Sequence, residues 1–366
     1  MTVTANDPAL QILIDRVRSA QASGAQLCIQ GGGTKAFYGE TLQGEPLDTR
    51  VLEGISSYEP TELVVTARCG TSLAQLEAVL AEQGQCLPFE PPHFAPGATV
   101  GGMVAAGLAG PSRATVGSVR DFVLGATLLT GRGDVMSFGG QVMKNVAGYD
   151  VARVLAGSLG TLGLIAEVSL KVLPMAPATA TLRFQMSQAQ ALGQLNRWGG
   201  QPLPLNASAW WDGTLVIRLR GALAAVRAAM TQLGGEVISP DYASPFWAGL
   251  RDHSDEFFVK AAAAVDTGAA LWRLSVPPTA PPLSLPGEQL IEWGGGQRWV
   301  CTTLAGSALR EVAAKAGGHA TLFRGHDKSG GVFAPLKSPL DRIHRELKKA
   351  FDPSGVFNPG RMYPGL

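Results

Sequence analysis

The segment QGGGTKAFYG (residues 30–39) decides the fold class, because three consecutive glycines directly follow the short apolar stretch 27–30. The apolar stretch is predicted to be a buried strand, and the glycines to form the loop that leaves it. Since glycine has no Cβ, this loop can approach a ligand closely, and its successive N–H groups can form a nest for a pyrophosphate. A tight turn without any ligand is an equal alternative for this segment alone.

The known phosphate-binding motifs do not match this loop. Neither G-x-x-x-x-G-K-[ST] nor G-x-G-x-x-G is present, which argues against P-loop and Rossmann sites. Three hydrogen bonds to charged oxygens, at roughly 1.5–3 kcal/mol each, barely reach the ~8 kcal/mol of micromolar binding, so a dinucleotide needs several segments. The chain offers three more glycine-containing segments, at 96–107, 144–150 and 157–165. Four segments together favour a bound dinucleotide over a plain turn.

Composition excludes several other classes of protein. The chain has 366 residues, enough for two domains or three, with 46 glycines, 46% hydrophobic residues and 16% charged residues. This balance excludes an intrinsically disordered chain, and no collagen-like glycine period is present. Thirty basic and 29 acidic side chains give a net charge of +1. We therefore expect no nucleic-acid partner and no general attraction to an anionic membrane.

Neither the N-terminal sequence nor the cysteine spacing predicts secretion, a membrane span or a metal cluster. No basic region followed by an apolar stretch opens the chain, so no secretory signal is expected. The most apolar window, 97–110, is too short and too rich in glycine to span a bilayer. Cys28, Cys69, Cys86 and Cys301 show no CxxC pairing. They are expected to be buried, reduced thiols of a cytosolic protein, and neither an iron–sulfur cluster nor a metal site is predicted.

The first 175 residues are predicted to alternate strands and helices, with glycine loops at the joints. Asp7 and Pro8 are typical of a helix start, and that helix ends near Gly24. Residues 72–75 match a capping box, which predicts a second helix that stops at Gly84. The other predicted elements are strands at 27–30, 62–67, 122–130 and 163–172, and a small-residue helix from 98 to 107.

After Pro174 the pattern changes to an α+β type with a largely antiparallel sheet. A Pro- and Gly-rich surface loop is expected at 277–287, and no internal repeat of fixed period is visible. Strands are predicted at 182–185, 214–219, 271–276, 289–293 and 299–304, and helices at 222–233, 307–315 and 339–351, the last with Leu340, Ile343, Leu347 and Ala350 on one face.

Four ordered segments resemble the FAD-linked oxidase family, the fold class of vanillyl-alcohol oxidase and para-cresol methylhydroxylase (PCMH). They are QGGGTKAFYG (30–39), PGATVGGMVAAGLAGP (96–111), MKNVAGYDVARVLAGSLGTLGLIAEV (143–168) and FDPSGVFNPGRM (351–362). Within the family, the chain is most similar to the smaller FAD-binding subunits of bacterial glycolate oxidases. The resemblance implies a PCMH-type FAD-binding domain of two α/β subdomains at 1–175, an α+β cap domain at 176–335, and a C-terminal helix and turn (336–366) that return to the FAD domain.

The resemblance also implies which residues contact FAD. The pyrophosphate would be held by Gly31, Gly32, Gly33, Thr34 and Lys35, mostly through backbone N–H groups. Pro96, Gly97, Thr99, Val100, Gly101 and Gly102 would line the ribityl and flavin side, with the helix after Thr99 aimed at phosphate. Asn145, Gly148 and Tyr149 would pack near the cofactor, Gly160, Gly163 and Ile165 would meet the adenosine, and Asn358 would return to the flavin. Plain turn geometry is the alternative for Gly160 and Gly163.

Two departures from the family define the expected chemistry. Some members tether FAD through a histidine beside the glycine loop, but Thr34 and Lys35 occupy that place here, so noncovalent FAD is predicted. Related 2-hydroxy-acid dehydrogenases carry a metal-binding HxHxGDGNxH motif, whereas this chain has five histidines and no HxH. His319, Arg324 and His326, in GGHATLFRGHDK, are weak catalytic candidates, and a structural or surface role is favoured for both histidines.

The resemblance therefore predicts the FAD-binding subunit of a heteromeric glycolate oxidase, an oxidoreductase that converts glycolate to glyoxylate. The chain would relay electrons or complete the complex, with a paralogous larger FAD subunit that carries the histidine motif and with an iron–sulfur subunit. We expect it in the cytoplasm, or peripheral at the inner face of the plasma membrane through its complex. Two alternatives are a stand-alone FAD-dependent 2-hydroxy-acid dehydrogenase and a non-catalytic assembly subunit.

Overall fold

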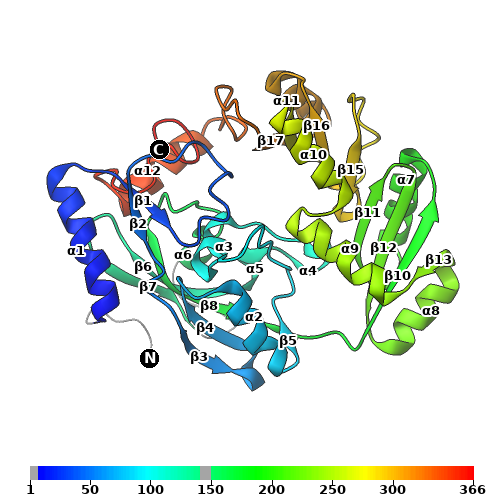
Figure 1. Ribbon diagram of the computed structural model, residues 1–366, viewed down its shortest axis with the longest axis horizontal. Coiled ribbons are helices and arrows are strands. Elements are labelled where there is room, and N and C mark those ends of the chain that lie inside the picture. The colour runs from blue at the N-terminus through cyan, green and yellow to red at the C-terminus, as the bar shows by residue number, and fades with distance from the viewer. Residues whose placement is uncertain (1–6, 141–149) are drawn as a thin grey trace. The chain divides into compact units, whose positions relative to one another are not determined.

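The computed structural model describes residues 7–140 and 150–366, which form two compact units (Figure 1). Unit 1 comprises Met1–Leu108, Ser118–Pro174 and Pro335–Leu366, and unit 2 comprises Ala109–Gly117 and Met175–Ala334. Residues 109–117, which the sequence places in the first predicted domain, thus belong to unit 2.

Unit 1 opens with the predicted helix and strand. The side chain of Asp7 accepts hydrogen bonds from the N–H groups of Ala9 and Leu10, and Gly24 ends α1 (Pro8–Ser23) in the left-handed conformation. Strand β1 (Leu27–Gln30) pairs in parallel with β2 (Glu45–Asp48). The apolar face of α1 is buried in the same core as Leu27 and Leu47, and this packing fixes the position of the glycine loop that follows β1 (Figure 1).

An antiparallel five-stranded sheet of order β3-β4-β8-β6-β7 completes the core of unit 1. Its central strand β8 is buried along almost its whole length. The strands predicted at 62–67, 122–130 and 163–172 are confirmed as β4, β6 and β8, but the predicted capping box is wrong, because the Ser72 side chain makes no capping hydrogen bond. Unit 1 also contains β3 (Ile55–Glu59), η1 (Pro60–Glu62), β4 (Val64–Arg68), α2 (Leu73–Glu82), β5 (Gln85–Cys86), α3 (Val100–Ala106), α5 (Val119–Phe122), β6 (Val123–Leu129), β7 (Val135–Gly139), α6 (Val151–Val154), β8 (Leu164–Lys171), β9 (Leu173–Pro174) and α12 (Leu340–Phe351).

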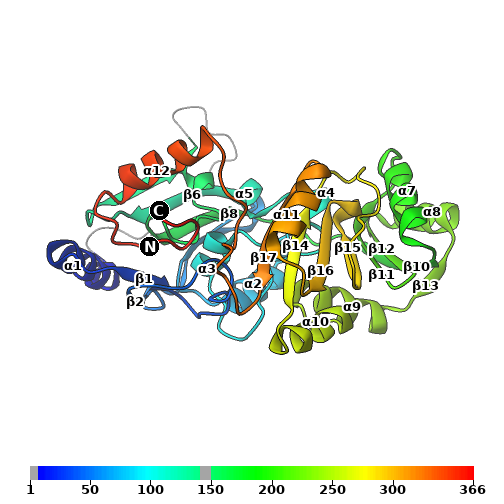
Figure 2. The same ribbon diagram turned by 90° about the horizontal axis from the view of Figure 1, so that it is seen from above.

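Unit 2 is an eight-stranded antiparallel sheet made of two halves with the same topology. The sheet order is β13-β10-β12-β11-β15-β16-β14-β17, and β11 and β15 join the halves. When the four strands of each half are numbered along the chain and counted from the outer edge of the sheet inward, both halves have the order 4-1-3-2. The duplication is topological, which is why no repeat of fixed period is visible in the sequence. Helices α7, α8 and α11 cover one face, and α9 and α10 cover the other (Figure 2).

The mainly antiparallel character predicted for this region is confirmed, but α7, α9, α10 and β11 were not predicted. Pro245 lies inside α9, so propensity alone argues against a helix there. Unit 2 contains α4 (Arg113–Val116), β10 (Ala178–Gln185), α7 (Gln188–Gly199), β11 (Leu205–Trp211), β12 (Thr214–Gly221), α8 (Leu223–Leu233), β13 (Glu236–Ile238), α9 (Pro240–Asp252), α10 (Glu256–Asp266), β14 (Ala270–Ser275), β15 (Gln289–Glu292), η2 (Trp293–Gly295), β16 (Gln297–Thr302), α11 (Gly306–Lys315) and β17 (His319–Arg324).

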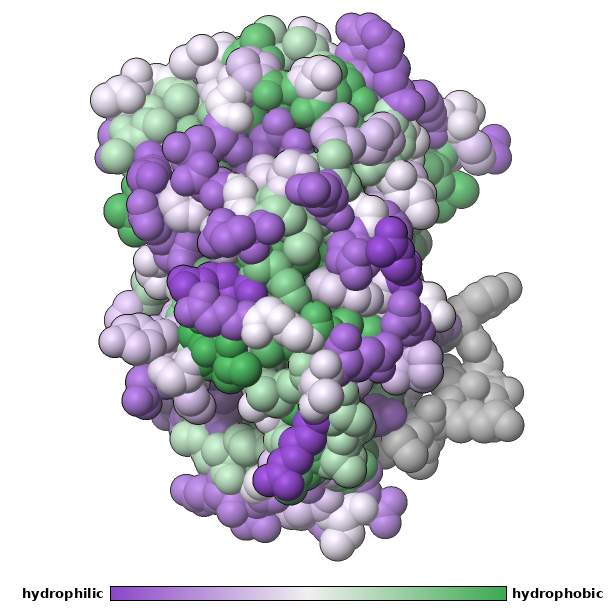
Figure 3. All heavy atoms as spheres, turned by 90° about the vertical axis from the view of Figure 1, so that its right-hand side faces the viewer, coloured by the Kyte–Doolittle hydropathy of each residue, from purple (hydrophilic) through white to green (hydrophobic). Residues whose placement is uncertain are grey.

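The four cysteine side chains differ in burial. All four cysteines are free; Cys28 and Cys69 are buried as predicted, whereas Cys86 and Cys301 are only half-buried. Over the ranges 7–140 and 150–366, no group of three or more His, Cys, Asp or Glu side chains could hold a metal ion. No helix within those ranges is both long and apolar enough to cross a membrane. On the face of the molecule shown in Figure 3, hydrophilic and hydrophobic residues are intermixed.

Candidate cofactor site

The glycine loop after β1 lies in direct backbone contact with the loop that precedes α3. A Cβ on Gly32 would lie 1.7 Å from the carbonyl oxygen of Gly97, and a Cβ on Gly31 would lie 2.3 Å from Oγ1 of Thr99. Gly33 has a φ of +70°, which disfavours any residue with a side chain. These three glycines are therefore required by close approach and by backbone conformation, whether or not a ligand binds.

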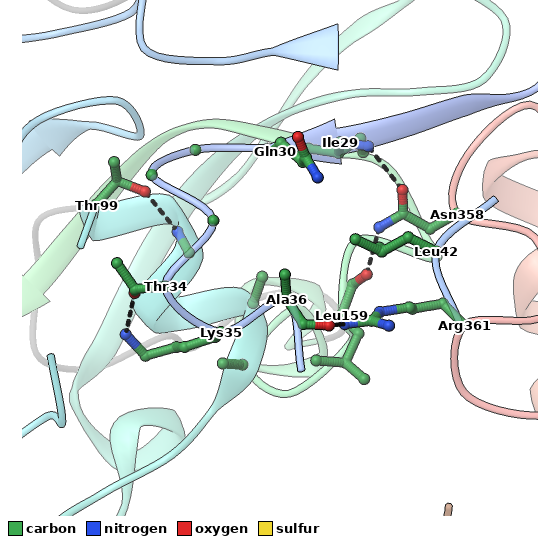
Figure 4. Close-up of a pocket in the computed structure, with 16 residues that line it drawn as sticks. Ile29, Gln30, Thr34, Lys35, Ala36, Leu42, Thr99, Leu159, Asn358 and Arg361 are labelled. Carbon is green, nitrogen blue, oxygen red and sulfur yellow. Dashed lines mark hydrogen bonds between the residues drawn. The ribbon is translucent and has the colours of Figure 1, made fainter. Parts of the chain in front are cut away.

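A pocket opens beside this loop, and five segments of the described part of unit 1 line it. In Figure 4, Thr34, Lys35 and Thr99 lie on one side of the pocket, and Asn358 and Arg361 lie on the other. The lining residues are Ile29, Gln30, Gly31, Gly32, Gly33, Thr34, Lys35, Ala36, Leu42, Thr99, Gly102, Ala105, Ala106, Leu159, Asn358 and Arg361.

Helix α3 forms one wall, and its first residues divide into lining and packing positions. Oγ1 of Thr99 accepts a hydrogen bond from the N–H of Gly102 at 3.2 Å, and both residues line the pocket. The N–H of Gly101 donates to the carbonyl of Cys69 at 2.8 Å, and a Cβ on Gly101 would lie 2.5 Å from Cβ of Cys69. Val100 is fully buried. Gly101 and Val100 thus pack α3 against the β4–α2 turn and do not line the pocket.

The C-terminal turn supplies the opposite wall. Oδ1 of Asn358 accepts a hydrogen bond from the N–H of Ile29 at 2.7 Å, and its Nδ2 donates to the carbonyl of Leu159 at 2.6 Å. A Cβ on Gly160 would lie 2.6 Å from that Nδ2 atom. Asn358 therefore fixes the end of β1 to the turn at 157–163, and Gly160 leaves room for its amide.

A buried ion pair holds the same turn from α12. Nζ of Lys348 lies 2.6 Å from Oδ2 of Asp352 and donates to the carbonyls of Thr161 and Phe357, at 2.8 and 2.7 Å. Burial lowers the pKa of Lys348, and Asp352 opposes that shift. This one ammonium group ties the end of α12 to the turn at 157–163 and to the segment 357–361, both of which supply residues that line the pocket.

Among the described residues, two cationic side chains line the pocket. Nζ of Lys35 lies 3.4 Å from Oγ1 of Thr34 and 5.6 Å from the ring centroid of Phe94. The guanidinium of Arg361 is buried and donates to backbone carbonyls. Burial lowers the pKa of Arg361, yet an arginine stays protonated in proteins. The pocket thus combines glycine backbone with positive charge, a combination that suits a pyrophosphate.

Several residues predicted to bind the cofactor lie elsewhere. Gly163 would place a Cβ 2.8 Å from the carbonyl of Leu129, and Ile165 is buried within β8, so neither lines the pocket. Pro96 and Gly97 are exposed beside it. The predicted contacts Asn145, Gly148 and Tyr149 lie outside the described residues.

The three catalytic candidates belong to unit 2, whereas the described residues that line the pocket belong to unit 1. His319 and Arg324 begin and end β17 of unit 2, His326 is exposed beyond it, and none of the three lines the pocket. Burial lowers the pKa of His319 and of Arg324. These positions are compatible with the structural or surface role favoured for the histidines.

His253, which no sequence motif singled out, is the most strongly perturbed histidine. Its ring stacks on that of Phe258 with the ring centroids 3.7 Å apart. The ring centroids of Trp299 and Phe323 lie 4.9 and 5.0 Å from that of His253. Burial, reinforced by Arg324 and Arg273, holds the pKa of His253 well below its usual value. It is therefore a neutral residue of the aromatic core.

The pocket also includes residues that the sequence did not indicate. Leu42, Ala105, Ala106 and Leu159 add apolar surface, and their sequence context carries no special signal. Arg361 follows directly after the NPG turn, so its position beside Asn358 could have indicated it.

Comparisons with known proteins agree with this geometry. A sequence model of the FAD binding domain family matches residues 10–139. The glycolate oxidase subunit GlcE of Escherichia coli (strain K12) is 48% identical over 356 residues, 97% of this chain and 98% of that protein. A D-lactate dehydrogenase of Anaerostipes hadrus is 31% identical over 44% of this chain and 32% of its own length. The solved structure of an alkyldihydroxyacetonephosphate synthase has the same fold, with a TM-score of 0.64 at 16% identity over 95% of this chain and 74% of that chain.

The fold and the pocket define a flavoprotein with a PCMH-type FAD-binding domain, within a group of FAD-dependent oxidoreductases. The chain belongs to the family of the glycolate oxidase subunit GlcE.

Proposed function

We propose that the chain is the FAD-binding subunit of a heteromeric glycolate oxidase, which converts glycolate to glyoxylate, and that it relays electrons or completes the complex. The full-length similarity to GlcE supports this role. Its partners would be a paralogous larger FAD subunit with a histidine-rich metal motif and an iron–sulfur subunit. Its four free cysteines are compatible with a cytoplasmic location, or one at the inner face of the plasma membrane through the complex.

The observation that carries the FAD site is the wall of glycine backbone at 31–33, which faces a pocket lined, among the described residues, by two cationic side chains. The N–H groups of this wall, with Thr34 and Lys35, would hold the pyrophosphate, and Thr99, Gly102 and Asn358 would border the rest of the cofactor. When bound, FAD supplies the acceptor for a hydride or for electrons. This chain's residues would bind and orient it.

Noncovalent binding is supported by the chemistry of the lining. None of the described residues that line the pocket is a histidine, cysteine or tyrosine, the side chains suited to a covalent flavin link. FAD should therefore leave the protein on denaturation.

The test begins with the chain purified alone and incubated with FAD. We expect visible flavin absorption after gel filtration, and a free flavin in the supernatant after acid precipitation. Protein that is folded but does not retain FAD would contradict the cofactor assignment. Flavin that stays with the precipitate would contradict noncovalent binding.

Glycolate then separates the proposed role from a stand-alone dehydrogenase. We expect the flavin of the isolated chain to stay oxidised with glycolate, and dye reduction to require the partner subunits. Rapid anaerobic bleaching of the isolated chain by glycolate would favour the stand-alone enzyme. Full activity of a complex that contains a FAD-free variant would favour a purely structural subunit.

A further inference from the structure

We propose that Arg361 is a positioning residue for the cofactor, because it braces the segment 36–40 and thereby holds the glycine loop in its binding shape. The inference rests on the proposed FAD function and adds a residue that the glycine motifs do not include. Arg361 lies 321 to 325 residues away in sequence from the carbonyls that it binds. Its role is therefore visible only in the folded chain.

The guanidinium of Arg361 is a fork for three carbonyl oxygens. Its Nη2 atom donates to the carbonyl oxygen of Ala36, at 2.8 Å, and to the carbonyl oxygen of Tyr38. Its Nη1 atom donates to the carbonyl oxygen of Glu40. The backbone reinforces the brace, because the N–H of Glu40 donates to the carbonyl of Arg361 at 2.9 Å. The segment 36–40 is thus held from both the side chain and the main chain of one residue.

Two backbone hydrogen bonds of turns connect the segment 36–40 to the glycine loop. The N–H of Ala36 donates to the carbonyl of Gly33 at 2.9 Å, and the N–H of Tyr38 donates to the carbonyl of Lys35 at 3.1 Å. A shift of the segment 36–40 would therefore move Gly33 and Lys35, both of which line the pocket. Figure 4 shows the Arg361 side chain directed toward Ala36 at the edge of the pocket.

Arginine is the side chain that this position needs. Arg361 is only 4% exposed, and the Glu40 carboxylate partly offsets the lowering of its pKa by burial. Carbonyl oxygens that converge in a buried place need several donors, which a planar guanidinium supplies and a single ammonium cannot match in geometry. The charge also lies beside a pocket that suits a phosphate.

The test compares Arg361→Lys and Arg361→Gln with Arg342→Gln, a control at an exposed arginine of α12. Apoprotein is titrated with FAD by flavin fluorescence, and amide hydrogen exchange of residues 36–40 is measured without FAD. We expect both Arg361 variants to raise the Kd for FAD at least about tenfold and to exchange faster at 36–40, because lysine keeps the charge but not the fork. The control should match the wild type in both measurements.

Two results would overturn the inference. If Arg361→Lys binds FAD as the wild type does, only the charge matters. If FAD binding weakens while exchange at 36–40 is unchanged, Arg361 contacts FAD directly and does not position the loop. Should Arg361→Gln fail to fold, the lysine variant carries the test alone. A wild-type chain that does not bind FAD would refute the proposed function, whereas the exchange measurement would still test the brace.

Discussion

Substitution of Gly32 by alanine should abolish tight FAD binding while the two units stay folded. The new Cβ would lie 1.7 Å from the carbonyl oxygen of Gly97 and 2.5 Å from its carbon, whereas such contacts stay above 3.0 Å in real structures. The two backbones must therefore separate by more than about 1 Å, since neither contact atom belongs to a side chain that could rotate away.

The size of the effect follows from the hydrogen bonds that this shift breaks. A bond from a backbone N–H to a charged phosphate oxygen contributes roughly 1.5–3 kcal/mol. Loss of two such bonds costs about 3–6 kcal/mol, which weakens binding by roughly a hundredfold to ten-thousandfold. Fluorescence titration of apoprotein with FAD measures the Kd, and thermal unfolding of the apoprotein reports the fold.

Gly31 provides a matched comparison, because its clash is with a side chain. A Cβ on Gly31 would lie 2.3 Å from Oγ1 of Thr99. Thr99→Ala removes that atom, so it should recover part of the FAD affinity of Gly31→Ala and none of that of Gly32→Ala. Gly193→Ala serves as the control, because nothing lies within 4 Å of its Cβ and alanine favours the α7 helix.

FAD binding by Gly32→Ala within threefold of the wild type would refute the reasoning, since the loop could then accommodate a side chain without losing its contacts. Equal rescue of both glycine variants by Thr99→Ala would refute the distinction between a backbone and a side-chain clash.

Three further predictions concern the residues around the core and the pocket. Lys348→Met should lower the free energy of unfolding by about 3–5 kcal/mol in urea, because Asp352 then stays buried without its cation, whereas the exposed Lys349→Met should have little effect. Asn358→Asp loses the donor to the carbonyl of Leu159, so the FAD Kd should rise at least about tenfold in the same titration, and an unchanged Kd would contradict this role. Because the pKa of folded His253 is depressed well below 6.5, only the unfolded chain takes up that proton as the pH falls below 6.5. Stability should then fall by up to about 1.4 kcal/mol per pH unit, and His253→Phe should reduce this slope in urea melts between pH 7 and 5.

Local signals account for what could be predicted about the fold. Asp7 and Gly24 delimit α1, and the apolar runs at β1, β6 and β8 became strands, because caps and burial patterns act within a few residues. Propensity failed for α9, where Pro245 lies inside a helix whose buried face includes Trp247 and Leu250. The duplicated topology of unit 2 could not be predicted, since it depends on strand pairing and not on repeated residues.

The candidate site, too, has a part that the sequence predicts and a part that it does not. The sequence by itself determined the glycine loop at 31–33, because only a missing Cβ permits its close approach to the loop at 97–99. It could not tell that Gly102 lines the pocket whereas Gly101 packs on Cys69, because both glycines satisfy the same motif.

Tertiary structure alone decided which polar groups are buried. The apolar pattern of α12 suggests that Leu340 and Ile343 face inward, yet each is 51% exposed, while Lys348 is buried on Asp352 and two carbonyls. Arg361 is likewise buried on the carbonyls of a segment more than 320 residues away. The free energy of burying a charge depends on partners that distant parts of the chain supply, so no local pattern determines it.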